Sequence, residues 1–167
     1  EENLDIQWRS TPNDPRYDTQ WALDTIHAEQ AWTYTTGGLS PNNDTIVAAV
    51  IDRTFDVLQE DLIDNIWHNH DEIPNNQIDD DQNGFIDDYT GWQMVYNTDL
   101  HNYGSVNNHG TSVLGIIGAK GNNGLGISGI NWNTKLMLLS AHTATEIIKI
   151  SNIIEGFSYI LEMRRLY

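Results

Sequence analysis

The sequence has no cysteine and few basic residues, and both shortages narrow the classes of protein to which it can belong. Without cysteine, disulfide bonds, thiolate zinc sites and cysteine nucleophiles are excluded, although the cellular compartment stays open. Only 8 Lys and Arg residues stand against 24 Asp and Glu residues, so the 167-residue chain has a formal net charge of -16 at pH 7. A field of this sign repels nucleic acids and anionic membrane surfaces and attracts cations. We therefore expect no nucleic-acid partner.

Long hydrophobic runs are also missing, because no stretch approaches the roughly 18 apolar residues of a membrane span. The chain opens with Glu-Glu-Asn and shows neither the basic nor the apolar region of a signal peptide. A mature chain, a trimmed chain and one that was never targeted all fit this beginning. The six Trp and seven Tyr, within an apolar fraction of 39%, suffice for the core of one folded domain.

The hydrophobic pattern predicts strands that alternate with helices downstream of a polar arm, residues 1–12. Continuous apolar runs predict strands buried on both faces, and helical spacing of apolar residues predicts the helices. The expected strands are 45–52, 91–96 and 135–140, and the expected helices lie within 20–32, at 109–118 and at about 145–165. Such alternation predicts an α/β fold with a parallel sheet.

Two polar residues stand where this pattern predicts burial. Asp52 ends an apolar strand, where an ionised Asp is rare unless it is hydrogen-bonded or paired, although a strand-terminal cap explains it equally well. His109 opens an apolar helix rich in small residues (HGTSVLGIIG), which indicates the close approach of backbone or substrate. A structural role would explain a lone His there, but the two residues together are more specific.

Acidic residues surround a glycine in residues 79–88 (DDDQNGFIDD), inside a long irregular segment. Such spacing is typical of calcium loops, in which oxygens converge around a sharp turn. A solvated acidic loop is the alternative, but its five carboxylates within ten residues repel one another without a cation. The loop departs from the EF-hand pattern because it lacks the final Glu. The predicted ligands are Asp79, Asp81, Asn83, the carbonyl of Phe85, and Asp87 or Asp88.

Four segments, taken in order, resemble the subtilisin-like serine proteases, the subtilases of peptidase family S8. They are similar to the mature N-terminus (13–32), the strand of the catalytic Asp with its acidic turn (47–62), the helix of the catalytic His (109–118) and a calcium-binding loop (121–130). The resemblance implies a three-layer α/β fold with a parallel sheet between helices, incomplete in this chain. Residues 13–167 would form the N-terminal part of the catalytic domain, with a calcium-loop insertion at about 68–103.

The resemblance also implies the chemistry. His109 would be the general base of a Ser-His-Asp triad, and Asp52 would orient it. Asp14, Asp61 and Asn123 would form a second calcium site, and a polypeptide substrate would lie beside residues 140–143 as an added strand. The resemblance therefore implies that the complete protein is a secreted, calcium-dependent endopeptidase. The pair His68 and His70 lacks a third ligand at helical spacing, so we expect no zinc site there.

The sequence departs from the family pattern in two respects. Arg53 and Thr54 replace the small residue and glycine that usually follow the triad acid. The motif of the nucleophilic Ser is missing, as is the Asn of the oxyanion hole, so we expect the chain alone to be inactive and the remaining C-terminal part of the domain to be its partner. A degenerate subtilase that acts as a calcium-stabilised binding module is the alternative, and an unrelated calcium-binding module is a weaker one.

Overall fold

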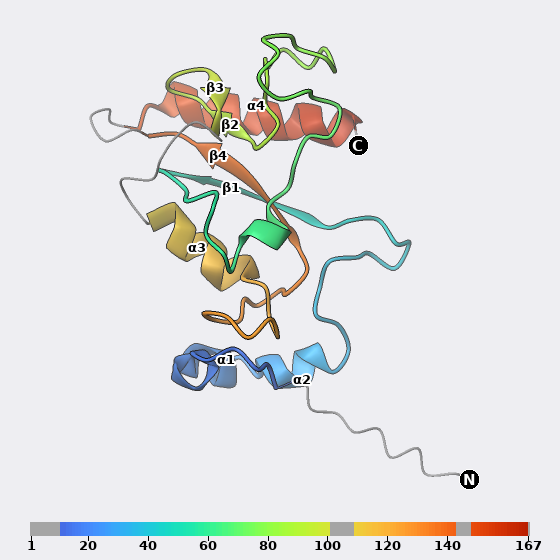
Figure 1. Cartoon of the computed structure of the whole chain (residues 1–167), viewed down its shortest axis with the longest axis vertical. Helices are drawn as coiled ribbons and strands as arrows, with labels where there is room; N and C mark the ends of the chain where they lie inside the picture. The colour runs from blue at the N-terminus through green and yellow to red at the C-terminus, as the bar shows by residue number, and fades with distance from the viewer. Residues whose placement is uncertain (1–10, 101–108, 143–147, 167) are drawn as a thin grey trace.

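The computed structural model describes residues 11–100, 109–142 and 148–166, which form an α/β fold around a mixed sheet (Figure 1). β1 and β2 both run parallel to β4, and β3 runs antiparallel to β2. The sheet is therefore mixed rather than wholly parallel, because the four residues between β2 and β3 permit only a hairpin. The strands, in the spatial order β1-β4-β2-β3, are β1 (Val47–Asp52), β4 (Lys135–Ser140), β2 (Trp92–Gln93) and β3 (Thr98–Asp99).

The helices follow the predicted pattern closely. The expected helix at 109–118 and the expected strand at 135–140 are confirmed with the same bounds. The last helix begins at Ile150, later than expected, because residues 148 and 149 are described and are not helical, while the expected start at about 145 lies outside the described residues. The helices are η1 (Tyr17–Thr19), α1 (Trp21–Thr25), α2 (Ala28–Trp32), η2 (Ile63–Asn65), α3 (His109–Gly118) and α4 (Ile150–Leu166).

Alternating side chains of β4 build two apolar layers, one on each face of the sheet. Leu136 and Leu138 belong to a cluster that includes Leu114 of α3. Met137 and Leu139 belong to a second cluster that includes Tyr159 and Met163 of α4. The two-residue period of a strand thus gives the layers α3, sheet and α4, with the sheet between the helices in Figure 1.

β1 is less buried than its apolar sequence predicts. Of its six residues only Val50 is buried, and Val47 is 37% exposed. Among the described residues β1 pairs in the sheet with β4 alone, so it is an edge strand. The expectation of burial on both faces is wrong here because it requires neighbours on both sides.

The N-terminal helices α1 and α2 pack beneath the loop that follows α3. Leu23, Ala28 and Trp32 form a small core with Trp132, and the rings of Trp32 and Trp132 lie 4.7 Å apart. The indole N–H of Trp32 donates to the Ile130 carbonyl over 2.9 Å. This contact holds the loop at 120–130 against the N-terminal part of the chain.

Candidate active site

Sheet pairing fixes the position of Asp52. The parallel register places Asp52, the last residue of β1, opposite Ser140, the last residue of β4. The Ala141 N–H continues the ladder by donating to the Asp52 carbonyl over 2.8 Å. Both strands therefore end at the same edge of the sheet, where parallel α/β folds usually place ligands.

The first turn of α3 is pressed against the chain that leaves β1. A Cβ atom on Gly110 would lie 2.5 Å from the Thr54 carbonyl oxygen, so only glycine permits this approach. The Thr111 hydroxyl accepts a 2.9 Å hydrogen bond from the Asp56 N–H. These contacts place the beginning of α3, and with it His109, beside the carboxyl end of β1.

The two predicted catalytic residues meet in the structure. His109 Nδ1 lies 2.8 Å from Asp52 Oδ1 and 2.9 Å from Oδ2. The His109 side chain is 64% exposed, whereas that of Asp52 is only 12% exposed. A carboxylate at Nδ1 favours the tautomer that carries its proton there, and in that tautomer Nε2 is the ring nitrogen that can accept a proton from a nucleophile. The pair has the geometry of an orienting acid and a general base.

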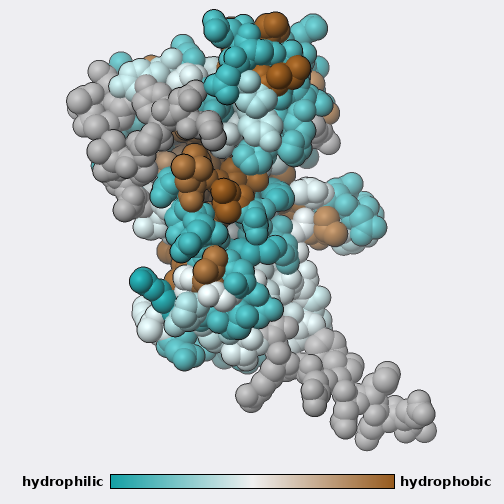
Figure 2. All heavy atoms as spheres, in the orientation of Figure 1, coloured by the Kyte–Doolittle hydropathy of each residue, from teal (hydrophilic) through white to brown (hydrophobic). Residues whose placement is uncertain are grey.

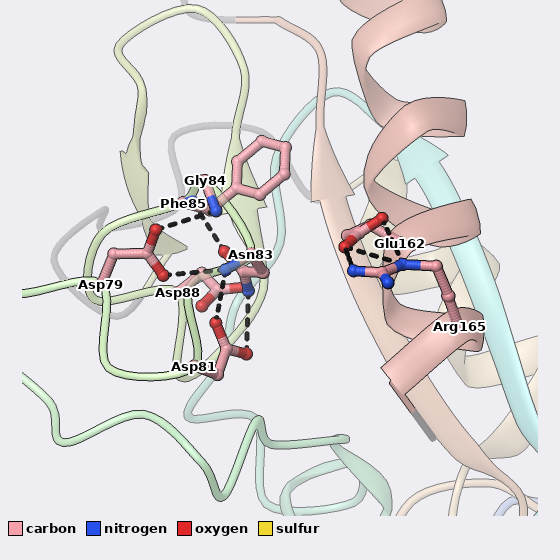
Figure 3. Close-up of polar contacts among 8 residues, drawn as sticks. All are labelled: Asp79, Asp81, Asn83, Gly84, Phe85, Asp88, Glu162 and Arg165. Atoms are coloured by element: carbon pink, nitrogen blue, oxygen red, sulfur yellow. Dashed lines mark hydrogen bonds and ion pairs between the residues drawn. The ribbon is translucent and has the colours of Figure 1, made fainter.

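Three acidic side chains converge near the acidic loop. Glu72, Asp81 and Asp88 each offer one carboxylate oxygen, and these oxygens lie within 4.8 Å of one another. Asn83 donates from its amide to Asp81 over 3.0 Å and to Asp88 over 3.1 Å (Figure 3). Asn69 donates to the same two carboxylates over 2.9 and 3.0 Å. The amide oxygens of Asn83 and Asn69 accept the N–H groups of Phe85 and Asp71 over 2.6 and 3.3 Å. Carboxylate oxygens like those of the converging group are the hard ligands that calcium prefers.

Two predicted ligands lie outside this group. Asp79 accepts the N–H groups of Asn83 and Gly84, each over 2.9 Å (Figure 3). Asp87 accepts the N–H groups of Asn76 and Gln77 over 2.9 and 3.0 Å. Both carboxylates thus shape the turns of the loop rather than extend the converging group. The Phe85 ring packs into the core, with its centroid 4.9 Å from that of Tyr159.

The sequence gives no sign of the role of Glu72. This residue precedes Asp79 by seven positions, yet it is only 3% exposed. Its carboxylate accepts the N–H groups of Asp80, Asp81 and Asp87 over 2.8, 3.3 and 3.0 Å. Glu72 could have been predicted as a ligand only if its burial had been known. Burial can be predicted from the periodicity of apolar residues in a helix or strand, and Glu72 lies in neither.

Burial raises the pKa of two carboxyl groups in this loop. It is the main cause that raises the pKa of Asp88 from 3.8 to about 6, and the charge of Asp81 adds to it. Burial likewise raises the pKa of Glu72, with the charges of Asp81 and Asp80 adding to it. Ionising such buried carboxyl groups costs free energy, and either a bound proton or a cation among them lowers this cost.

Without calcium, raising the pH from 5 to 7 is expected to lower the unfolding temperature. Asp88 binds its proton more tightly in the folded state than in the unfolded state. The protonated carboxyl group therefore stabilises the fold fully below pH 3.8, and this contribution is lost as the pH rises through about 6. The full shift corresponds to roughly 3 kcal/mol. Thermal unfolding in a calcium chelator measures the slope, and Asp88→Asn, which carries no titrating proton, should flatten it. An equal slope in that variant would refute the assignment.

The second predicted group also lies together, but its oxygens are satisfied by the protein. Asp14 accepts the N–H groups of Asn122 and Asn123 over 2.8 and 3.0 Å, as well as the Ser128 hydroxyl. Asp61 accepts the Asn123 amide and the Ile127 N–H, each over 2.9 Å. Both carboxylates therefore fold the loop at 122–128 by accepting its N–H groups, which explains their burial without a cation.

His68 and His70 both contact the ring of Tyr89. His68 stacks on Tyr89 with ring centroids 4.7 Å apart, and His70 meets the same ring edge-on at 6.1 Å. Among the described residues, neither histidine joins a group of His, Asp and Glu that could hold a metal ion.

The part of the chain that contains Asp52, His109 and α3 matches a known protein family. Residues 43–165 match the family model described as Peptidase_S8, the subtilase family. The chain belongs to the subtilase family. It is 34% identical over 157 residues to subtilisin-like protease 1 of Plasmodium berghei (strain Anka), which covers 91% of this chain. It is 29% identical over 132 residues, 78% of its length, to the halolysin-like extracellular serine protease Nep of Natrialba magadii.

The match covers only part of these relatives. This subtilase chain spans 25% of the Plasmodium berghei protein and 20% of the Natrialba magadii protein. A solved protease from Pseudoalteromonas arctica PAMC 21717 superimposes with a TM-score of 0.56 at 23% identity, over 88% of this chain and 43% of that one. This likeness confirms the subtilisin-like α/β fold. Within the described residues, no helix combines the length and the apolar character that crossing a membrane requires.

Proposed function

We propose that the chain is the N-terminal part of the catalytic domain of a secreted, calcium-dependent serine endopeptidase that hydrolyses polypeptides. In this proposal His109 takes the proton of a serine hydroxyl and later returns it to the leaving amine, while Asp52 stabilises the imidazolium between the two steps. The contact of His109 Nδ1 with both Asp52 oxygens, at 2.8 and 2.9 Å, is the observation that carries it. Secretion is proposed because one relative is named as an extracellular protease.

The nucleophile and the oxyanion donor are proposed to come from a segment outside residues 1–167. Two surfaces fit such a segment. β1 is an edge strand in the described part of the chain, and α4 carries large apolar side chains at helical spacing on its outer side. These side chains are Ile150, Ile154, Phe157 and Leu161, which are 78, 60, 63 and 70% exposed. Unpaired edges and apolar stripes of this kind are usually covered in a native fold. On the face of the molecule drawn in Figure 2, brown apolar side chains also gather in the middle, among teal and pale ones.

Calcium is proposed to bind among Glu72, Asp81 and Asp88, and the Asn83 side chain, which donates to Asp81 and Asp88, lies beside this group. The converging oxygens and the raised pKa of Asp88 both support a cation there. The ion would neutralise repelling carboxylates and stabilise the loop, and we assign it no part in bond cleavage. The Asp14, Asp61 and Asn123 group remains a second proposal that rests on resemblance alone.

Labelling with a fluorophosphonate, which reacts with activated serines, tests the proposed function. The full-length protein is expected to carry one adduct on a serine outside residues 1–167, and residues 1–167 produced alone are expected to carry none. Intact-mass spectrometry followed by peptide mapping locates the adduct. Full-length protein that is folded, calcium-loaded and unlabelled would overturn the proposal.

One observation favours the alternative of a degenerate, calcium-stabilised binding module. Arg53 and Thr54 follow the triad acid where the family usually has a small residue and glycine, although the pair of Asp52 and His109 still forms. A degenerate subtilase would bind peptides without cleaving them. The labelling experiment therefore separates the two functions.

A further inference from the structure

Arg53 lies between the catalytic pair and the end of β4. Its backbone N–H donates to Asp52 Oδ1 over 2.6 Å, and its carbonyl accepts the hydroxyl proton of Ser140. The backbone of Arg53 is thus held by the triad acid on one side and by the neighbouring strand on the other. The residue itself is exposed, so its side chain extends from this fixed position into solvent.

The charge of Arg53 stands out in this molecule. The chain carries 8 basic and 24 acidic side chains, and Asp52 and Asp56 lie beside Arg53 in the sequence. Within the residues that the structure describes, no hydrogen bond or ion pair engages the Arg53 guanidinium. The net charge of -16 would repel an acidic peptide that approaches His109, whereas the Arg53 side chain, next to Asp52, would attract it. A guanidinium matches a carboxylate with two parallel hydrogen bonds, a geometry that lysine does not reproduce.

We propose that Arg53 is a specificity-determining residue, which selects peptides that carry Asp or Glu within two residues of the cleaved bond. This inference rests on the proposed protease function and names its substrate class. Arg53 adjoins Asp52, and Asp52 contacts the base that would act on the scissile bond, so only substrate residues near that bond come within reach of the side chain. The glycine and small residues usual in the family carry no such charge.

Matched peptides test the proposal in the full-length protease. Each pair carries Glu or Gln at one of the two positions on either side of the cleaved bond and is otherwise identical. At one position or more, the wild type is expected to cleave the Glu peptide about 5-fold faster in kcat/KM, the upper range for a solvent-accessible ion pair. The ratio should fall to about 1 in Arg53→Gln, drop below 1 in Arg53→Glu, keep an intermediate value in Arg53→Lys and decrease at high salt.

A control variant distinguishes a local contact from a general effect of charge. Lys135 starts β4, at the opposite end of the strand from Ser140, and its ammonium donates to the Asp64 carbonyl. Lys135→Gln removes one positive charge as Arg53→Gln does, and it should keep the wild-type Glu to Gln ratio. A ratio near 1 at all four positions in the wild type, or an unchanged ratio in Arg53→Gln, would overturn the inference. If no Gln peptide is cleaved either, the proposed protease function fails and the inference fails with it.

Discussion

Replacing His109 by Ala in the full-length protein is expected to lower kcat by about 10⁶-fold, the size of effect known when the general base of a subtilisin triad is lost. His109 Nε2 is the proposed proton acceptor, and alanine leaves the serine hydroxyl without a base. Because the side chain is 64% exposed, its removal leaves no buried cavity, so the fold should persist. Steady-state hydrolysis of a peptide, measured with circular dichroism as a check on folding, gives the result.

Asp52→Asn should cost less, about 10⁴-fold in kcat, with a small change in KM. The Asp52 carboxylate accepts at both of its oxygens, from Nδ1 of His109 and from the N–H of Arg53. An Asn side chain offers one oxygen, and its NH₂ group facing Nδ1 would favour the tautomer that carries its proton on Nε2, which cannot act as a base. His70→Ala, which removes an exposed histidine that lies edge-on to Tyr89, is the matched control and should keep wild-type turnover. Normal turnover in His109→Ala would end the assignment of both residues.

Asp52 and His109 could be singled out from the sequence because each ends or begins an element with a strong pattern. An apolar run places Asp52 at the end of β1, and a helical run places His109 at the start of α3, although 57 positions separate the two. The hydrophobic pattern does not predict that the side chains of Asp52 and His109 meet. This contact depends on Gly110, which lets the helix approach Thr54, and on the register of β1 with β4.

The acidic loop was less predictable because it has no repeat and no secondary structure. Its composition predicts a cation site, and Asp81, Asn83 and Asp88 do lie together. Spacing alone could not tell these residues from Asp79 and Asp87, whose carboxylates accept nearby backbone N–H groups. In a loop with several left-handed residues, which include Gln82 and Asp87, the direction of each side chain follows the local turns rather than any period.

Tertiary contacts with α4 also lay beyond the sequence pattern. The Phe85 ring meets Trp92 and Tyr159 edge-on, with centroid distances of 5.0 and 4.9 Å. The indole N–H of Trp92 donates to the carboxylate of Glu155, in α4, over 3.1 Å. The acidic loop is therefore joined to the core on the α4 side of the sheet, so a cation that orders the loop would also stabilise this layer.

Calcium is expected to raise the unfolding temperature of the full-length protein by about 5–10 °C at an ion concentration 100-fold above its Kd. Glu72→Gln and Asp88→Asn should each abolish binding of one ion per chain and the matching part of this shift. Each removes a charged oxygen from the converging group. Calcium titration by calorimetry counts the ions, and thermal unfolding with and without chelator measures the shift.

Asp79→Asn and Asp87→Asn are the controls that separate the converging group from the rest of the loop. Each removes one charge from the same segment, as the test variants do, but the carboxylate concerned accepts backbone N–H groups outside the converging oxygens. These two variants should unfold at a lower temperature in chelator and still bind the same number of ions as the wild type. If Asp79→Asn lost an ion while Glu72→Gln kept it, the ligand set read from the sequence would replace the one proposed from the structure. Such an ion would lie at the glycine turn, away from Glu72.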